Sequence, residues 1–134
     1  MKRKNISSHS PFEKDIGFSR AVRIGNIISV SGTASIDPDG STTHVGDVYG
    51  QTKHCIHIMK KAIEDAGGNL EHVIRTRILL KDITKWKEAA QAHSEFFSTI
   101  QPACTFVEVT NFVNPDWLVE TEADCVLSVA KDTT

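Results

Sequence analysis

Residues 101–109 read QPACTFVEV, and residues 119–129, beyond a short loop, read VETEADCVLSV. Apolar and polar side chains alternate in both stretches, which is typical of β-strands. Between them, Asn114-Pro115-Asp116 favours a turn, because proline fixes its own φ angle and the flanking side chains suit turns. We therefore expect two strands here, over residues 104–110 and 119–129.

Two amphipathic helices are expected before these strands. Apolar side chains recur at three- and four-residue steps over residues 47–66, with Asp47 as the N-terminal cap and Gly67 as a left-handed end. The same period returns over residues 84–100, and Thr84 is the expected cap of this second helix. Both helices present one apolar stripe, so each needs a sheet or another helix to cover it.

Further strands are expected in the first half of the chain and between the helices. Residues 18–24 and 27–31 flank Gly25-Asn26, a two-residue hairpin signal, and residues 33–36 end in a turn. Residues 73–80 are rich in β-branched and leucine side chains, with Ile74 expected on one face together with Thr76, Ile78 and Leu80. This order predicts an α+β domain: a mixed sheet of about six strands with two helices on one face. The other face is left for a partner subunit.

Length and composition limit the classes of protein that are possible. With 134 residues and 40% hydrophobic content, the chain is expected to form one domain over residues 16–134, and the polar residues 1–15 are expected to form a flexible arm. Fifteen basic and seventeen acidic residues are interspersed, so nucleic acid is not an expected partner. The sequence shows neither a membrane span nor a secretory signal, and the three cysteines suit free thiols. We expect a cytoplasmic protein.

Eight short segments occur in an order that matches a known family. They are Val30-Ser31-Gly32, Gln51, Ala66-Gly67, Leu80-Lys81-Asp82, Phe96-Phe97, Pro102-Ala103, Val107-Glu108-Val109 and Val119-Glu120-Thr121-Glu122-Ala123. From about residue 17 to residue 129 the chain resembles the RidA (YjgF) family. The resemblance implies a chorismate-mutase-like fold, a homotrimer around a central β-barrel, and ligand clefts between neighbouring subunits. We expect neither a cofactor nor a metal ion.

The resemblance also implies a chemistry, the hydrolysis of reactive enamines and imines such as 2-aminoacrylate. In the family an arginine binds the substrate carboxylate and a glutamate on the last strand helps to place water. Glu120 matches that glutamate, whereas Cys104 stands at the position of the arginine. Phe18 stands at the place of a family tyrosine, and Ala90 and His93 at those of an asparagine and a tyrosine. The ligand-binding residues expected on this basis are Phe18, Arg20, Ser31, Ala90, His93, Cys104 and Phe106.

Several of these residues have more than one interpretation. Glu120 shares a strand face with Glu122 and Asp124, so all three carboxylates are candidates for ion pairs with Arg75 or Arg77, and Glu120 alternatively for a general base. Cys104 is either a small strand residue or, if His93 or Glu120 lies within reach, a nucleophile. His93 suits a buried or cleft-lining histidine. Arg20 is a candidate substitute for the missing arginine.

Two functions therefore stay open. The first is a trimer that binds small carboxylated or carbonyl metabolites and hydrolyses an imine or enamine with water placed by Glu120. The second is a non-catalytic, ligand-binding or regulatory trimer that has lost deaminase activity. His54 and His57, three residues apart on the first expected helix, lack a third metal ligand in the sequence and favour a solvated helix face.

Overall fold

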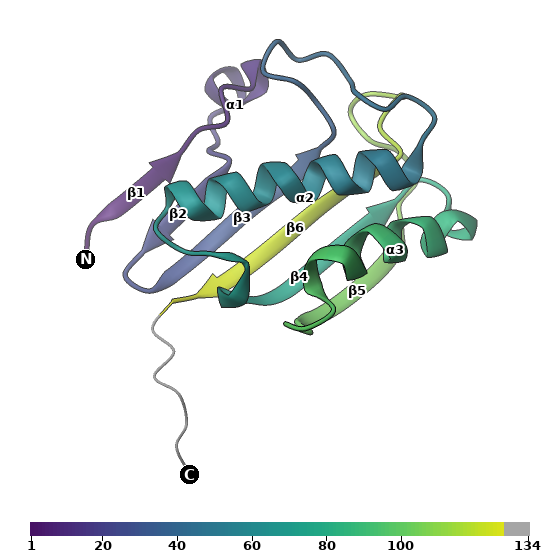
Figure 1. Cartoon of the computed structure of the whole chain (residues 1–134). Helices are drawn as coiled ribbons and strands as arrows, with labels where there is room; N and C mark the ends of the chain where they lie inside the picture. Colours follow the sequence, from purple (N-terminus) through teal and green to yellow (C-terminus); the bar gives the residue numbers. More distant parts are fainter. Residues whose placement is uncertain (128–134) are drawn as a thin grey trace.

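A computed structural model of the chain describes residues 1–127. A single six-stranded sheet runs through it, in the order β1-β2-β3-β6-β4-β5 (Figure 1). The strands are β1 (Arg3–Ile6), β2 (Ala21–Ile24), β3 (Ile27–Ala34), β4 (Val73–Leu80), β5 (Ala103–Glu108) and β6 (Val119–Val126). The pair β4–β5 is parallel and every other neighbouring pair is antiparallel, so the sheet is mixed, as the sequence predicts.

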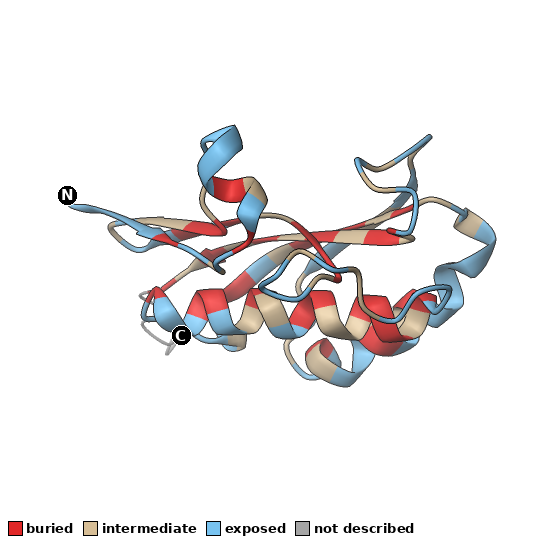
Figure 2. Cartoon of the chain, turned by 90° about the horizontal axis from the view of Figure 1, so that it is seen from above, coloured by how far each residue is buried: buried red, intermediate tan, exposed pale blue. Residues whose placement is uncertain are grey.

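Two long helices, α2 (Val48–Asp65) and α3 (Trp86–Phe97), cover one face of this sheet, whereas the short α1 (Pro11–Ile16) lies on the other side (Figure 2). Two 3-10 turns, η1 (Leu70–His72) and η2 (Ile83–Lys85), precede β4 and α3. The side chain of Asp47 accepts a hydrogen bond from the Gly50 amide at 3.0 Å and caps α2. Gly67, just beyond the end of α2, has a φ of +95°, which glycine adopts without strain. Both ends of α2 thus agree with the sequence.

The core lies between the sheet and the two long helices. One cluster joins the middle of α2 to β3 and β6 through side chains such as Ile28, Ile56 and Met59, all completely buried. A second cluster, with Ile78, Leu80 and Val119, lies under the start of α2 and under α3. Residues 119–126 alternate between buried and half-buried positions, so Glu120, Glu122 and Asp124 point away from this core.

The structure corrects three expectations. Residues 1–15 do not form a loose arm, since β1 pairs with β2 and α1 follows directly. Ile74 is 54% exposed because the register of β4 shifts between Val73 and Arg75, which turns Ile74 out of the core. The residue that begins the α3 region is Asp82, not Thr84: its carboxylate caps η2 by accepting from the amide and hydroxyl of Thr84 at 3.0 and 2.6 Å. The last residues of the strand expected over 119–129 lie outside the described residues.

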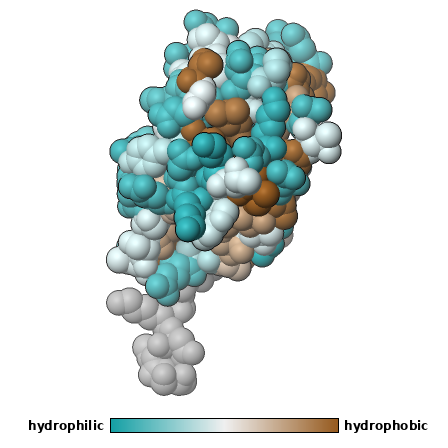
Figure 3. Space-filling model, turned by 90° about the vertical axis from the view of Figure 1, so that its right-hand side faces the viewer, coloured by the Kyte–Doolittle hydropathy of each residue, from teal (hydrophilic) through white to brown (hydrophobic). Residues whose placement is uncertain are grey.

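The end of the molecule that carries the β3–α2 and β5–β6 loops has a mostly hydrophilic surface with separate apolar groups (Figure 3). Within residues 1–127, the helices are too short or too polar to cross a bilayer.

Gln51 ties the start of α2 to the loop that leads into β6. Its amide donates to the carbonyl oxygens of His44 (3.3 Å) and Asp116 (2.9 Å), and its Oε1 accepts from the Leu118 amide at 2.8 Å, although the side chain is completely buried. Gln51→Ala leaves these buried backbone groups without partners, and we expect it to lower the free energy of unfolding by about 1–3 kcal/mol. Urea denaturation measures this, with Gln91→Ala on the exposed side of α3 as control. Equal losses in both variants would contradict the prediction.

Candidate functional site

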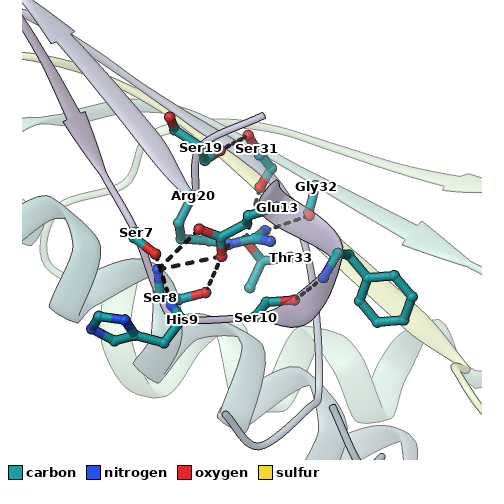
Figure 4. Close-up of polar contacts among 11 residues, drawn as sticks. Ser7, Ser8, His9, Ser10, Glu13, Ser19, Arg20, Ser31, Gly32 and Thr33 are labelled. Atoms are coloured by element: carbon teal, nitrogen blue, oxygen red, sulfur yellow. Dashed lines mark hydrogen bonds and ion pairs between the residues drawn. The ribbon is translucent and has the colours of Figure 1, made fainter. Parts of the chain in front are cut away.

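The N-terminal segment is joined to β3 by a buried ion pair between Glu13 of α1 and Arg20 (Figure 4). The two side chains are 6% and 5% exposed, and Arg20 Nε lies 3.7 Å from Glu13 Oε2. Arg20 Nη1 donates to the Gly32 carbonyl oxygen at 2.6 Å and to Thr33 Oγ1 at 3.0 Å. Glu13 also accepts hydrogen bonds from the amide and the hydroxyl of Ser8. Arg20 is the residue just before β2, and its side chain lies against β3, where it binds Gly32 and Thr33.

A bulge in β3 brings the backbone close to Glu120. The register between β3 and β6 shifts between Val30 and Thr33, so Ser31 and Gly32 have no direct partners on β6. A Cβ atom on Gly32 would lie 3.9 Å from both carboxylate oxygens of Glu120. The absence of a side chain at Gly32 thus leaves the Glu120 carboxylate lying over bare backbone. The Ser31 hydroxyl donates to the Ser19 carbonyl oxygen at 2.6 Å, so this expected ligand-binding residue has a structural bond.

The three carboxylates of β6 do not share one environment. Asp124 forms an ion pair with Arg77 at 3.1 Å, and Glu122 approaches the same guanidinium at 3.9 Å. Glu120 has neither a hydrogen bond nor an ion pair with any residue in the range 1–127. Of the two interpretations of these carboxylates, ion pairing with Arg77 holds for Glu122 and Asp124, and Glu120 stands apart.

Burial raises the pKa of Glu120 above its ordinary value, because removal from water disfavours the ionised form. The Arg20 charge acts in the opposite direction, and the negative charge of Glu122 adds to the rise. A carboxylate with a raised pKa is a stronger base than the carboxylate of an exposed glutamate.

A cavity of about 430 Å³ connects these groups. It lies beyond the start of β2, between residues 7–20, the 32–38 segment and one side of α2, and Phe18, Arg20 and Glu120 all line it. Arg20 lies 5.3 Å from the centre of the Phe18 ring in a cation–π contact. The volume falls within the range of about 300–1,000 Å³ that is usual for small-molecule sites. The structure thus brings together three of the expected site residues around one hollow.

The other expected residues lie elsewhere in the chain. Ala90 and His93 are on α3, and Cys104 and Phe106 are on the helix-covered face of β5, whereas Glu120 points from the opposite face of the sheet. His93 Nε2 is 2.8 Å from Thr76 Oγ1, and the His93 ring lies against Phe97 (4.6 Å between centroids) and near Phe106 (6.3 Å). Burial lowers the pKa of His93. This histidine has a structural partner, and one protomer does not bring it to Glu120.

Two further expectations concern metals and thiols. In the part of the chain that the structure describes, no three His, Cys, Asp or Glu side chains converge as metal ligands, and His57 instead meets the Phe96 ring edge-on at 5.0 Å. Cys55 and Cys125 are buried free thiols, and burial raises the pKa of Cys125 to about 12. Cys104 is exposed, and within residues 1–127 its thiol has no hydrogen bond with His93 or Glu120.

Two features of the site were not predicted from the sequence: the ion pair that Glu13 forms with Arg20, and the side of the cavity that α1 forms. One local signal for this helix was present, since Ser10 followed by Pro11 is a typical helix start, and Ser10 Oγ indeed accepts from the Phe12 amide at 3.3 Å. Nothing local indicates that Glu13 reaches Arg20, because that contact depends on how α1 folds back over β3.

Comparison with known proteins agrees with this architecture. The model of the family described as Endoribonuclease L-PSP matches residues 10–127. A YjgF-family protein from Mycobacterium tuberculosis superposes with a TM-score of 0.85 and 38% identity, covering 94% of this chain and all of that one. The chain belongs to the RidA (YjgF) family. Its fold is accordingly the chorismate-mutase-like α+β fold of that family, also seen in the YjgF gene product of E. coli (27% identity, TM-score 0.79, 92% of this chain and 98% of that one).

Sequence relatives in the RidA (YjgF) family include two with RutC names. A RutC family protein from Pyrococcus abyssi is 37% identical over 111 residues, which are 82% of this chain and 87% of that protein. The protein named 3-aminoacrylate deaminase RutC from Acinetobacter baylyi is 35% identical over 100 residues, or 75% of this chain and 79% of that protein. The resemblance stated from the sequence is therefore confirmed.

Proposed function

We propose that this RidA-family protein hydrolyses an imine or enamine, with water placed and activated by Glu120. The observation that carries the proposal is the Glu120 carboxylate: half-buried, unpaired within residues 1–127, and lining a cavity beside the bare backbone of Gly32. The relative named 3-aminoacrylate deaminase supports the reaction class. Glu122 and Asp124 serve as internal comparisons, because they are carboxylates on the same strand face that are bound to Arg77.

The proposed reaction consumes one water molecule. Glu120 accepts a proton from water as the water oxygen bonds to the carbon of the C=N group. The carboxyl group returns that proton to the nitrogen, which gives a carbinolamine with a hydroxyl and an amino group on one carbon. Glu120 then takes the hydroxyl proton and passes it to the amino nitrogen as the C–N bond breaks, so that ammonia leaves and a carbonyl group remains. An enamine first takes up a proton on carbon to become the imine. A carboxyl group with a raised pKa suits both steps, since it must act as a base and then as an acid.

The binding of a substrate carboxylate is the weak point of this site. The two cationic side chains that line the cavity, Arg20 and Lys61, already have acidic partners in Glu13 and Asp65. Arg20 therefore does not offer the free guanidinium that the sequence suggested as a substitute for the missing arginine. Loss of a charged hydrogen-bond pair weakens binding by about 1.5–3 kcal/mol.

We include in the proposal a homotrimer, with each cleft completed by a neighbouring subunit. One chain leaves Glu120 on the sheet face opposite α2 and α3, and it leaves Ala90, His93, Cys104 and Phe106 at the far edge of the sheet. The family resemblance implies that these two parts of the cleft, from neighbouring subunits, meet in the trimer. Exposed apolar side chains on the face opposite the long helices, such as Ile27 at 54%, support a partner there.

The second candidate is a non-catalytic ligand-binding or regulatory trimer. It is favoured by Arg20 and Lys61, because both are already paired with acidic side chains. A cavity whose positive charges are internally balanced is able to hold a ligand without the orientation that catalysis needs. The two candidates differ in one measurable respect, which is turnover.

Turnover is tested with 2-imino acids formed in situ by a dehydratase or an L-amino-acid oxidase, with ammonia release measured against a buffer blank. We expect the wild-type protein to accelerate release. We also expect Cys104→Arg to lower the KM for 2-iminopropanoate, the three-carbon imine formed from 2-aminoacrylate, by about 10- to 150-fold. The reason is that an arginine at this position supplies a charged contact to the substrate carboxylate. Cys104→Ser controls for loss of the thiol. If ammonia release with wild type and with Cys104→Arg does not exceed that of the blank for any imine, the catalytic proposal is wrong. The second candidate, a non-catalytic ligand-binding protein, is then the one that remains.

A further inference from the structure

The cavity beside Glu120 is larger and more apolar than a three-carbon substrate requires. Most of the surface that lines it is apolar, although polar residues also contribute, and aromatic and aliphatic side chains supply a large part of it, among them Phe12, Phe18, Ile36, Ile58 and Trp117. A volume of about 430 Å³ accommodates a ligand of drug size, of which 70–90% of the surface is commonly buried. Most of this space therefore remains for a part of the ligand that does not react.

The aromatic part of the wall is held in a defined position. The Phe12 ring meets the Trp117 ring edge-on at 5.8 Å, and the Trp117 indole N–H donates to Thr42 Oγ1 at 3.1 Å. Phe12 belongs to α1, which is fastened to β3 by the buried pair of Glu13 and Arg20 (Figure 4). The wall is thus part of the folded structure and is in place before a ligand binds.

The mouth of the cavity is also apolar. Ile16 and Val113 line it, yet they are 67% and 82% exposed. Large aliphatic side chains at the rim of a hollow lose contact with water when an apolar ligand group enters. The two cationic side chains of the cavity, Arg20 and Lys61, already form ion pairs with Glu13 and Asp65. The apolar side chains are therefore the groups that we expect to select the ligand.

We propose that the substrate of this site is a 2-imino acid with a large apolar side chain, aromatic or branched aliphatic, and that Phe12 and Ile16 contact that side chain. This inference rests on the proposed function for the reaction and on the cavity for the choice of substrate. Burial of a side chain of phenylalanine or leucine size strengthens binding by about 10- to 150-fold, which is comparable with the contribution of the arginine contact that is missing here.

The kinetic test compares imines made by an L-amino-acid oxidase from phenylalanine, leucine and alanine. We expect kcat/KM for the phenylalanine- and leucine-derived imines to exceed that for the alanine-derived imine by at least about tenfold. Phe12→Ala and Ile16→Ala reduce this ratio, and Ile16 is exposed enough that its truncation leaves the fold intact. Val45→Ala, which removes an exposed apolar side chain outside the cavity, leaves the ratio unchanged. An equal or better rate with the alanine-derived imine overturns the inference.

A binding test separates this inference from the catalytic proposal. Phenylpyruvate and pyruvate, the corresponding keto acids, are titrated by calorimetry and by intrinsic tryptophan fluorescence, to which Trp117 in the cavity wall contributes together with Trp86. We expect phenylpyruvate to bind at least about tenfold more tightly, and Phe12→Ala to remove the difference. Tight binding of phenylpyruvate without turnover of any imine would contradict the proposed catalysis but support a ligand with a large apolar side chain. Turnover with no preference in either test, or binding of neither keto acid, would overturn the ligand class.

Discussion

Glu120→Gln should reduce kcat/KM for imine hydrolysis by about 100- to 10,000-fold while the fold persists. The amide keeps the size and hydrogen-bonding capacity of the side chain but takes up no proton from water. The matched control is Glu122→Gln, two residues along the same strand face, where the carboxylate is bound to Arg77 instead of being free. Ammonia release measures both variants. Similar losses in the two would show that the charge of the strand, and not Glu120 itself, matters.

The same substitution has a second readout in stability. Because the pKa of Glu120 is raised in the folded protein, the native state binds this proton more tightly than the unfolded chain does. Stability from this group is therefore lost as the pH rises from the unfolded value, near 4.5, through the higher folded value. Glu120→Gln removes the penalty, so its Tm should exceed that of wild type at pH 7, with the difference disappearing below about pH 4.

Glu13→Ala should lower the free energy of unfolding by about 3–5 kcal/mol. It leaves the Arg20 guanidinium buried without its counter-charge and deprives the Ser8 amide of its acceptor. Burial already lowers the pKa of Arg20, and the Glu13 charge acts against that shift. Chemical denaturation measures the loss.

The control for this prediction is the exposed pair of Lys61 and Asp65 on α2. Its charges are separated by 3.2 Å, closer than those of Glu13 and Arg20, but both side chains are in water. Asp65→Ala should therefore change stability by only about 0.3–0.5 kcal/mol. A loss in Glu13→Ala no larger than that in Asp65→Ala would mean that α1 contributes little to the fold.

Local signals were sufficient to predict much of the fold. Gly25-Asn26 indicates the hairpin that joins β2 and β3, residues 73–80 coincide with β4, and Asp47 caps α2 as expected. Each of these depends on residues that are adjacent in sequence or one helical turn apart. Ile74 shows the limit of such reasoning, because a register shift against β6 decides its face.

The candidate site depended more on distant contacts. In sequence, Glu120 and Glu122 alternate in the same way, and they are distinguished by the position of Arg77 on β4 and by the cavity, which Glu120 alone of the two lines. Arg20 was a reasonable candidate for a free cation until α1 placed Glu13 against it. Cys104 and Glu120, both expected in one cleft, lie on opposite faces of the sheet within a chain.

The position of β6 has a consequence for how the protein is made. Among residues 1–127 it is the last strand in sequence, but it lies between β3 and β4, so it joins a unit of β1, β2 and β3 to a unit of β4 and β5. Until residues 119–126 leave the ribosome, each unit has an unpaired strand edge, and long-range pairing of this kind is slow. The two units can therefore join into one sheet only once β6 has been made, and the carboxylate of Glu120 arrives with the strand that closes it.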